Sequence, residues 1–241
     1  MTERQQQILK AIIQKYINTA QAVSSEAVVS HYGLNISPAT ARNEMKELEE
    51  KGYLYQPHTS AGRIPTEKAY HFYIKNLQEI NRNLAGRKRR KNLTEIISSL
   101  EDKDLSDALR EITHFLAEES ENLAFGGIKE LREFHCAGLS NLLKEPEFRD
   151  TEILTSVVRL VEQVDRYMEK IFSAIPFQET RIFIGKQNPL AKFKQTSLIV
   201  TACRLPRKKH GLLAILGPTR MRYELNVGLL NQVKDYIEEL W

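Results

Sequence analysis

The side chains most suited to chemistry in this sequence are hydrogen-bond donors in one short segment, residues 37–51. Ser37 followed by Pro38 is typical of a helix start, with serine as the N-cap and proline in the first turn. At 100° per residue, one side of this helix is small near its start and rich in donors. Together with the N-cap, these residues are Ser37, Ala39, Thr40, Arg42, Asn43 and Lys46. Such a face is suited to base edges and phosphates in a major groove, and a solvated helix face is the alternative.

Groupings typical of an enzyme, a metal site or a cofactor site are missing from the sequence. The motifs GxSxG, P-loop and HExxH do not occur, and Cys136 and Cys203 form no CxxC pair. The six histidines lack metal-ligand spacing: His31, His58, His71, His114, His135 and His210. Arg220, beside an expected helix start, suits either a bound anion or a structural ion pair, and we favour the ion pair. The sequence therefore predicts a protein that is not an enzyme and has no cofactor.

The elements expected around the donor-rich helix are two further helices before it and a hairpin after it. Thr2 begins a capping box for a first helix that ends near residues 18–19, and Ser24 or Ser25 caps a second helix that stops at Gly33. In the third helix the apolar residues share the side opposite the donors, where they are expected to pack on the first two helices: Ala41, Met45 and Leu48.

The segment after Gly52 is expected to form a polar β-hairpin. Residues 53–55 are β-formers, Pro57 ends the first strand, and Thr66 caps a fourth helix after the return strand. Three helices followed by a hairpin are the winged-helix pattern, in which the hairpin tip contacts phosphates and the minor groove. The residues predicted to do so are His58, Thr59, Ser60 and Arg63.

The charge of the chain is divided unevenly along its length. Residues 1–92 carry 15 lysines and arginines against 8 glutamates, a net charge of +7, and the rest carries a net charge of −3. A basic N-terminal half favours a polyanionic partner. The sequence has no apolar run of about 18 residues, and its first ten residues are polar. We therefore expect a cytoplasmic protein without a membrane partner.

The quoted motifs carry a family resemblance. The segment SPATARNEMKELEEKGYLYQPHTSAGRIPT, residues 37–66, resembles the DNA-binding domain of the heat-inducible transcription repressor (HrcA) family, and the match runs from residue 2 to about 77. AGLSNLLKEPEF, IGKQNP, SLIVTA and GLLAILGPTRMRY, which begin at residues 137, 184, 197 and 211, resemble the C-terminal signature of the same family. In that family the C-terminal domain has a GAF-like α+β fold.

The expected fold is therefore α+β: a winged helix-turn-helix domain at residues 1–80, a basic linker at 81–92, and a reduced GAF-like domain at 93–241. The run of five basic residues at 87–91 is interpreted as a solvated linker rather than as an arm on phosphates. Strands are expected at 181–185, 198–203 and 212–216, followed by a C-terminal helix. The interval 93–135 is too short for the family's inserted dimerising module plus the first part of its sheet.

A long helix with an apolar seam is expected between Leu154 and Ile175. The seam alternates steps of three and four: Leu154, Val157, Val161, Val164, Met168, Ile171 and Ile175. Packing on the sheet of the same domain is favoured, because Val158, Leu160 and Phe172 broaden the apolar face. An intermolecular coiled coil is the alternative, and the C-terminal helix at 223–241 is the next candidate for a dimer contact.

The resemblance implies a repressor of chaperone genes that binds an inverted-repeat operator, the CIRCE element, as a homodimer whose activity the chaperonin supports. An inverted repeat requires a two-fold protein, so the dimer follows from the operator. The alternative function is a winged-helix regulator of other genes, whose GAF-like domain senses a small molecule. An RNA-binding protein is disfavoured because the donor-rich face has no aromatic stacking platform.

Overall fold

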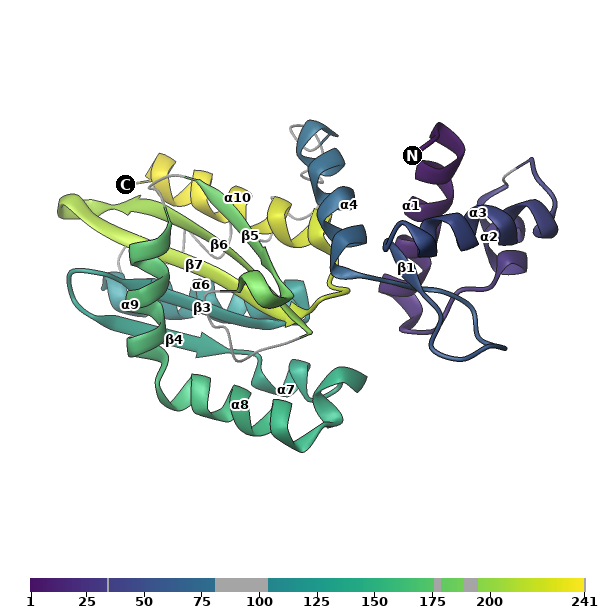
Figure 1. Cartoon of the computed structure of the whole chain (residues 1–241). Helices are drawn as coiled ribbons and strands as arrows, with labels where there is room; N and C mark the ends of the chain where they lie inside the picture. Colours follow the sequence, from purple (N-terminus) through teal and green to yellow (C-terminus); the bar gives the residue numbers. More distant parts are fainter. Residues whose placement is uncertain (34, 81–103, 176–178, 189–194, 241) are drawn as a thin grey trace. The chain divides into compact units, whose positions relative to one another are not determined.

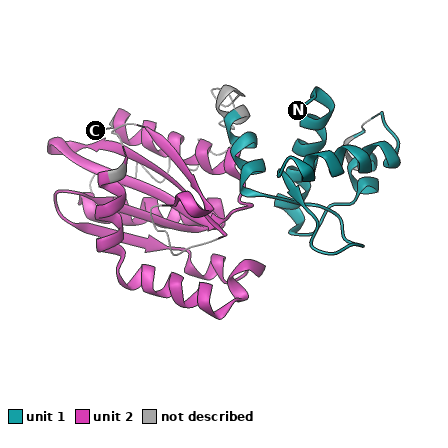
Figure 2. Cartoon of the chain, in the orientation of Figure 1, with its two compact units in different colours: residues 1–80 teal, residues 81–241 magenta. Residues whose placement is uncertain are grey.

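The computed structural model describes residues 1–33, 35–80, 104–175, 179–188 and 195–240. The chain divides into two compact units, residues 1–80 and 81–241 (Figure 2). The basic run at 87–91, and with it the predicted linker, lies outside the described residues. Within the described ranges, no helix combines the length and the apolar character needed to span a membrane.

The first unit contains four helices and a short hairpin. They follow the order α1 (Glu3–Thr19), α2 (Ser25–Tyr32), α3 (Pro38–Glu50), β1 (Leu54–Tyr55), β2 (Ile64–Pro65) and α4 (Glu67–Ile80) (Figure 1). The N-cap residues of the first three helices are the predicted ones, with Ser24 rather than Ser25 capping α2: Thr2, Ser24 and Ser37. Gly52 follows α3 in the left-handed region, with φ 75°, as expected of a residue that stops a helix.

The core of this unit forms where the apolar faces of its helices pack against one another. On α1 the fully buried side chains are Ile8, Leu9, Ile12 and Ile13. Ala41, Met45 and Leu48 of α3 are buried opposite the donor-rich face, as the sequence predicts. Burial of one face of α3 leaves the other face free to bind a ligand.

The second unit is a five-stranded sheet with helices on both faces. The strands are β3 (Leu123–Ile128), β4 (Glu133–Ala137), β5 (Thr180–Ile184), β6 (Thr196–Leu205) and β7 (Lys209–Pro218), in the order β4-β3-β7-β6-β5. All neighbouring strands are antiparallel. The α+β class predicted from the sequence is therefore confirmed.

Two helices pack on one face of this sheet, α6 (Leu105–Ser120) and α10 (Tyr223–Leu240). The other face carries α7 (Leu139–Leu142), a 3₁₀ turn at Pro146–Arg149, α8 (Thr151–Glu162) and α9 (Val164–Ala174). Figure 1 shows the sheet between these two helical layers. Because β3, β6 and β7 are covered on both faces, nearly all their residues are buried and their apolar residues run together instead of alternating.

The single helix predicted over residues 154–175 is wrong. The structure has two helices, α8 and α9, and Gln163 between them adopts φ −120° and ψ 31°, which is not helical. The prediction that the seam packs on its own sheet is confirmed, because Val157, Leu160, Met168 and Ile171 belong to the core beneath the sheet. The intermolecular coiled coil is thereby disfavoured.

Two strands, β3 and β4, were not predicted. The sequence of β3, LAFGGI, has two glycines and is buried at all six positions, so neither strand propensity nor alternation marks it. Packing requires the first of these glycines: a Cβ on Gly126 would lie 2.2 Å from Thr113 Oγ1 on α6. The first strand of the sheet, β3, therefore begins at Leu123, inside the interval 93–135 that the sequence predicts to be too short for the inserted module and the first part of the sheet together.

Candidate nucleic-acid interface

The predicted donor-rich face is present on α3 as one continuous surface. Ser37, Ala39, Arg42, Asn43 and Lys46 are exposed, and Thr40 is partly exposed. The Ser37 hydroxyl accepts a hydrogen bond from the Thr40 backbone N–H at 3.1 Å, which fixes the first turn of the helix. The structure therefore brings together all six residues predicted on this helix.

A buried side chain of α1, Gln5, is hydrogen-bonded to two glutamates of α3. Gln5 is only 1% exposed, and its Nε2 donates to Glu44 Oε2 at 3.0 Å and to Glu47 Oε2 at 2.7 Å. Lys51 Nζ donates to Gln5 Oε1 at 2.9 Å. The sequence indicated a capping box that begins at Thr2 but not this link, because the partners of Gln5 lie about forty residues further along the chain. The network fixes the axis of α3 relative to α1.

A hydrogen-bonded turn shapes the tip of the wing, residues 57–62. The Ala61 N–H donates to His58 O at 2.9 Å, and Gln56 Nε2 donates to the carbonyls of Thr59 and Ala61 at 2.9 and 2.8 Å. His58, Thr59 and Ser60 are exposed, so three of the four predicted wing residues lie at this tip. Gln56, which holds the turn from inside, was not recognised in the sequence.

Arg63, the fourth predicted wing residue, lies at the base of the wing. Its side chain is 13% exposed, and its Nε lies 2.9 Å from Glu49 Oε2 at the end of α3. Its backbone pairs with Val23 through two hydrogen bonds of 2.8 and 2.9 Å. Glu49 Oε1 also accepts the backbone N–H of Gln56 at 2.9 Å, so one carboxylate joins both ends of the wing to α3. Arg63 is thus engaged inside the domain and is not grouped with the exposed tip.

The approach of the wing base to Val23 requires a glycine. A Cβ on Gly62 would lie 2.3 Å from the Val23 carbonyl oxygen, closer than any tolerated contact. Gly62 therefore permits the backbone pairing that places the wing beside the start of α2.

An exposed ion pair lies on the donor-rich face. Arg42 Nη2 is 3.2 Å from Glu26 Oε1 in the first turn of α2. Hydrogen bonds from the Glu26 backbone N–H and the Ser24 hydroxyl hold the pKa of Glu26 below its usual value. A charged Glu26 would repel DNA phosphates and competes for Arg42, an effect that the sequence did not reveal.

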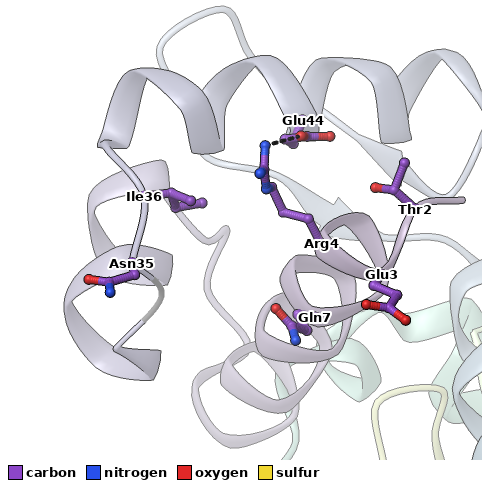
Figure 3. A pocket seen from close by; sticks show the side chains of 7 residues that line it. All are labelled: Thr2, Glu3, Arg4, Gln7, Asn35, Ile36 and Glu44. Atoms are coloured by element: carbon purple, nitrogen blue, oxygen red, sulfur yellow. Dashed lines mark hydrogen bonds and ion pairs between the residues drawn. The ribbon is translucent and has the colours of Figure 1, made fainter.

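A hollow of about 610 Å³ lies between the start of α1 and the α2–α3 turn. Ile36 and six polar or charged residues line it, and Figure 3 shows Arg4 reaching across to Glu44. The six are Thr2, Glu3, Arg4, Gln7, Asn35 and Glu44. Arg4 Nη1 lies 3.4 Å from Glu44 Oε1, so its charge is already paired. With two carboxylates and one paired cation in its lining, the hollow is poorly suited to phosphate.

Arg220 in the second unit forms the structural ion pair that the sequence favours. Its Nε lies 2.7 Å from Glu147 Oε1, and its Nη2 contacts Glu145. Burial works to lower the pKa of Arg220, but hydrogen bonds and charge from Glu147 and Glu145 outweigh burial and raise it. This pairing ties the turn before α10 to the 3₁₀ segment before α8 and leaves no cationic site for an anion there.

Comparisons with known proteins match both units. Residues 1–79 match a family model described as winged helix-turn-helix transcription repressor, HrcA DNA-binding, and residues 58–227 match one described as HrcA protein C terminal domain. A solved structure described as that of a hypothetical protein has a TM-score of 0.80 and 18% identity, covering 100% of this chain and 98% of its own. That likeness supports the fold.

Two relatives of known name cover the whole chain. The heat-inducible transcription repressors HrcA of Geobacter sulfurreducens and Brevibacillus brevis are 25% and 26% identical to it, over 100% of this chain and 98% of each relative. Both alignments span 335 positions while this chain has 241 residues, so at least 94 aligned positions have no residue here. Because family models match both the winged domain and the C-terminal domain, this chain belongs to the HrcA family.

Proposed function

We propose that this chain is a sequence-specific DNA-binding repressor of heat-shock genes that binds an inverted-repeat operator of the CIRCE type. The observation that carries the proposal is the match of residues 1–79 to the family's DNA-binding domain, together with the exposed donor face of α3. Relatives named heat-inducible transcription repressor HrcA support the regulatory role. A cytoplasmic location follows, because the proposed partner is the bacterial chromosome.

In the proposed complex the start of α3 enters the major groove. Ala39 allows close approach, Arg42 and Asn43 reach base edges, and Lys46 contacts phosphate. Ser37 and Thr40 at the helix start supply hydroxyls to the backbone of the DNA. His58, Thr59 and Ser60 at the wing tip contact the neighbouring phosphates or minor groove.

In this proposal the chain acts as a homodimer, because an inverted repeat presents two equivalent half-sites. The core-facing apolar residues of α8 and α9 are used within the domain, and so are those of α10, where Leu230, Val233 and Ile237 are at most 1% exposed. The proposal therefore rests on operator symmetry and assigns the dimer to no particular helix. Regulation by chaperonin is part of the proposal through the family resemblance.

A small-molecule sensor with other target genes is the weaker alternative. The relatives' names favour heat-inducible repression instead.

Footprinting of the full chain on the host's own chaperone promoters tests the proposal. The expected result is protection of two half-sites related by a dyad, and sedimentation should give two chains per operator. Protection of a single site without a dyad, or no preference over unrelated promoters, would contradict it.

A further inference from the structure

The hairpin between β6 and β7 carries an unusual concentration of positive charge. Residues 204–210 read RLPRKKH, and the last paired positions of the two strands are Leu205 and Lys209. Arg207 and Lys208 at the tip are exposed, and Lys209 is partly exposed. Among the residues that the structure describes, none of these three cations has a carboxylate partner, so their charge is available to a ligand.

The nearby carboxylates are used at the base of the hairpin. Glu130 accepts from the backbone N–H of His210 at 2.8 Å, and its Oε1 lies 2.5 Å from His210 Nδ1. Glu238 accepts from the backbone N–H of Arg204 at 3.0 Å. These contacts hold the base of the hairpin and leave the tip electropositive, around a surface hollow of about 430 Å³ lined by residues 204–210.

The tip places bulky cations where the backbone favours glycine or asparagine. Arg207 has φ 57° and ψ 35°, and Lys208 has φ 60°. Side chains with a Cβ are strained in this left-handed region, whereas asparagine and glycine adopt it readily. Arg207 and Lys208 therefore destabilise the turn that they form. Strain of this kind is typical of functional sites.

The hairpin lies at the same end of the sheet as the turn between β3 and β4. Gly211, next to the hairpin, pairs with Ile128 at the end of β3, and Lys129 N–H donates to His210 O at 3.0 Å. On the neighbouring strand β4, His135 Nε2 lies 3.2 Å from Ser106 Oγ in the first turn of α6.

We propose that the β6–β7 hairpin binds phosphates of the duplex outside the segment read by the winged domain. The tip is cationic, exposed and without an aromatic anchor, which fits sequence-independent phosphate contacts better than a protein interface, where buried aromatic residues dominate. This inference rests on the proposed function. It gives the C-terminal domain a direct part in operator affinity.

The test uses the full chain with the double substitution Arg207→Asn and Lys208→Gly. Both new residues suit the left-handed turn, so the melting temperature of the protein should rise by about 2–4 °C. On an operator with long flanks, affinity should fall several-fold and the slope of log affinity against log salt should flatten by about 0.9 per lost contact. Discrimination between operator and scrambled half-sites should stay unchanged, which keeps this test separate from that of the winged domain.

A matched control removes two lysines elsewhere on the same unit, Lys144→Gln and Lys186→Gln, and should leave the salt slope unchanged. A duplex trimmed to the two half-sites should abolish the difference between wild type and the hairpin variant. If the variant gains stability but keeps wild-type affinity and salt slope on the long duplex, the hairpin is only a strained turn or binds an acidic protein, and the proposal is wrong.

Discussion

Arg63 Nε lies 2.9 Å from Glu49 Oε2, and this pair joins the wing to the last turn of α3. The side chains are 13% and 32% exposed, so water screens the pair less than it screens the surface pairs of the same domain. The wing and the recognition helix are therefore positioned as one body, and an arginine of the hairpin that resembles a DNA contact is used for that purpose.

The first prediction concerns this pair. Arg63→Gln and Glu49→Gln should each weaken operator binding, and the double variant should be no weaker than either alone, because both act through one contact. Neither change should flatten the salt slope. If Arg63 instead touches a phosphate, Arg63→Gln flattens the slope by about 0.9, and Glu49→Gln strengthens binding by releasing the guanidinium.

The second prediction concerns base recognition by α3. Arg42→Ala and Asn43→Ala should each reduce discrimination at one operator position by about 1–3 kcal/mol, because each side chain is exposed on the donor-rich face and can form a bidentate contact with one base. Binding isotherms on a series of single-base operator variants measure the effect. Equal weakening on every variant would assign the residue to phosphate contact, and Lys46→Ala should behave in that second way.

The third prediction concerns the acidic residue beside Arg42. Glu26→Gln removes a charge 3.2 Å from Arg42 Nη2 and should tighten operator binding several-fold at low salt, with a smaller gain at high salt. The measurement is operator affinity by fluorescence anisotropy over a salt series. Loss of affinity in this variant would indicate that Glu26 orients Arg42 for binding.

The pH dependence of this effect follows from the direction of the Glu26 pKa. Because that pKa lies below its usual value in the folded protein, the carboxylate contributes stability above its unfolded-state pKa, and this contribution is lost as pH falls through the lowered value. The advantage of Glu26→Gln in binding should thus remain constant through the neutral range. It should shrink only in acid, where the wild-type carboxylate becomes protonated.

The fourth prediction separates core from surface on α8 and α9. Met168 is fully buried beneath the sheet, so Met168→Asp should cost several kcal/mol and unfold the second unit, as seen by circular dichroism. Val158 on the preceding helix is 39% exposed, and Val158→Asp should leave the fold and the sedimentation coefficient intact. If the Met168→Asp variant is instead folded and sediments with half the mass of the wild-type protein, the intermolecular coiled coil is the better interpretation of the seam.

The sequence by itself determined the features whose signals are local. Ser37 and Pro38 start α3, Gly52 stops it, and a period of 3.6 separates its buried from its exposed side, because caps and helical periodicity act within a few residues. The same holds for the strands β5, β6 and β7, whose apolar runs are bounded by turn residues. The exposed positions of the residues predicted on α3 and at the wing tip could be inferred for this reason.

Only the tertiary structure decided the contacts between residues far apart in the chain. The burial of Arg63 against Glu49 and the links from Gln5 to Glu44 and Glu47 depend on how α1, α3 and the wing pack, and side-chain type alone does not distinguish an arginine that binds DNA from one that binds a carboxylate. The strand β3 escaped prediction because helices cover it from both sides, so burial at every position removed the alternation that marks a half-exposed strand. The break between α8 and α9 at Gln163 is likewise seen only in the structure, because the apolar period of the sequence continues across it.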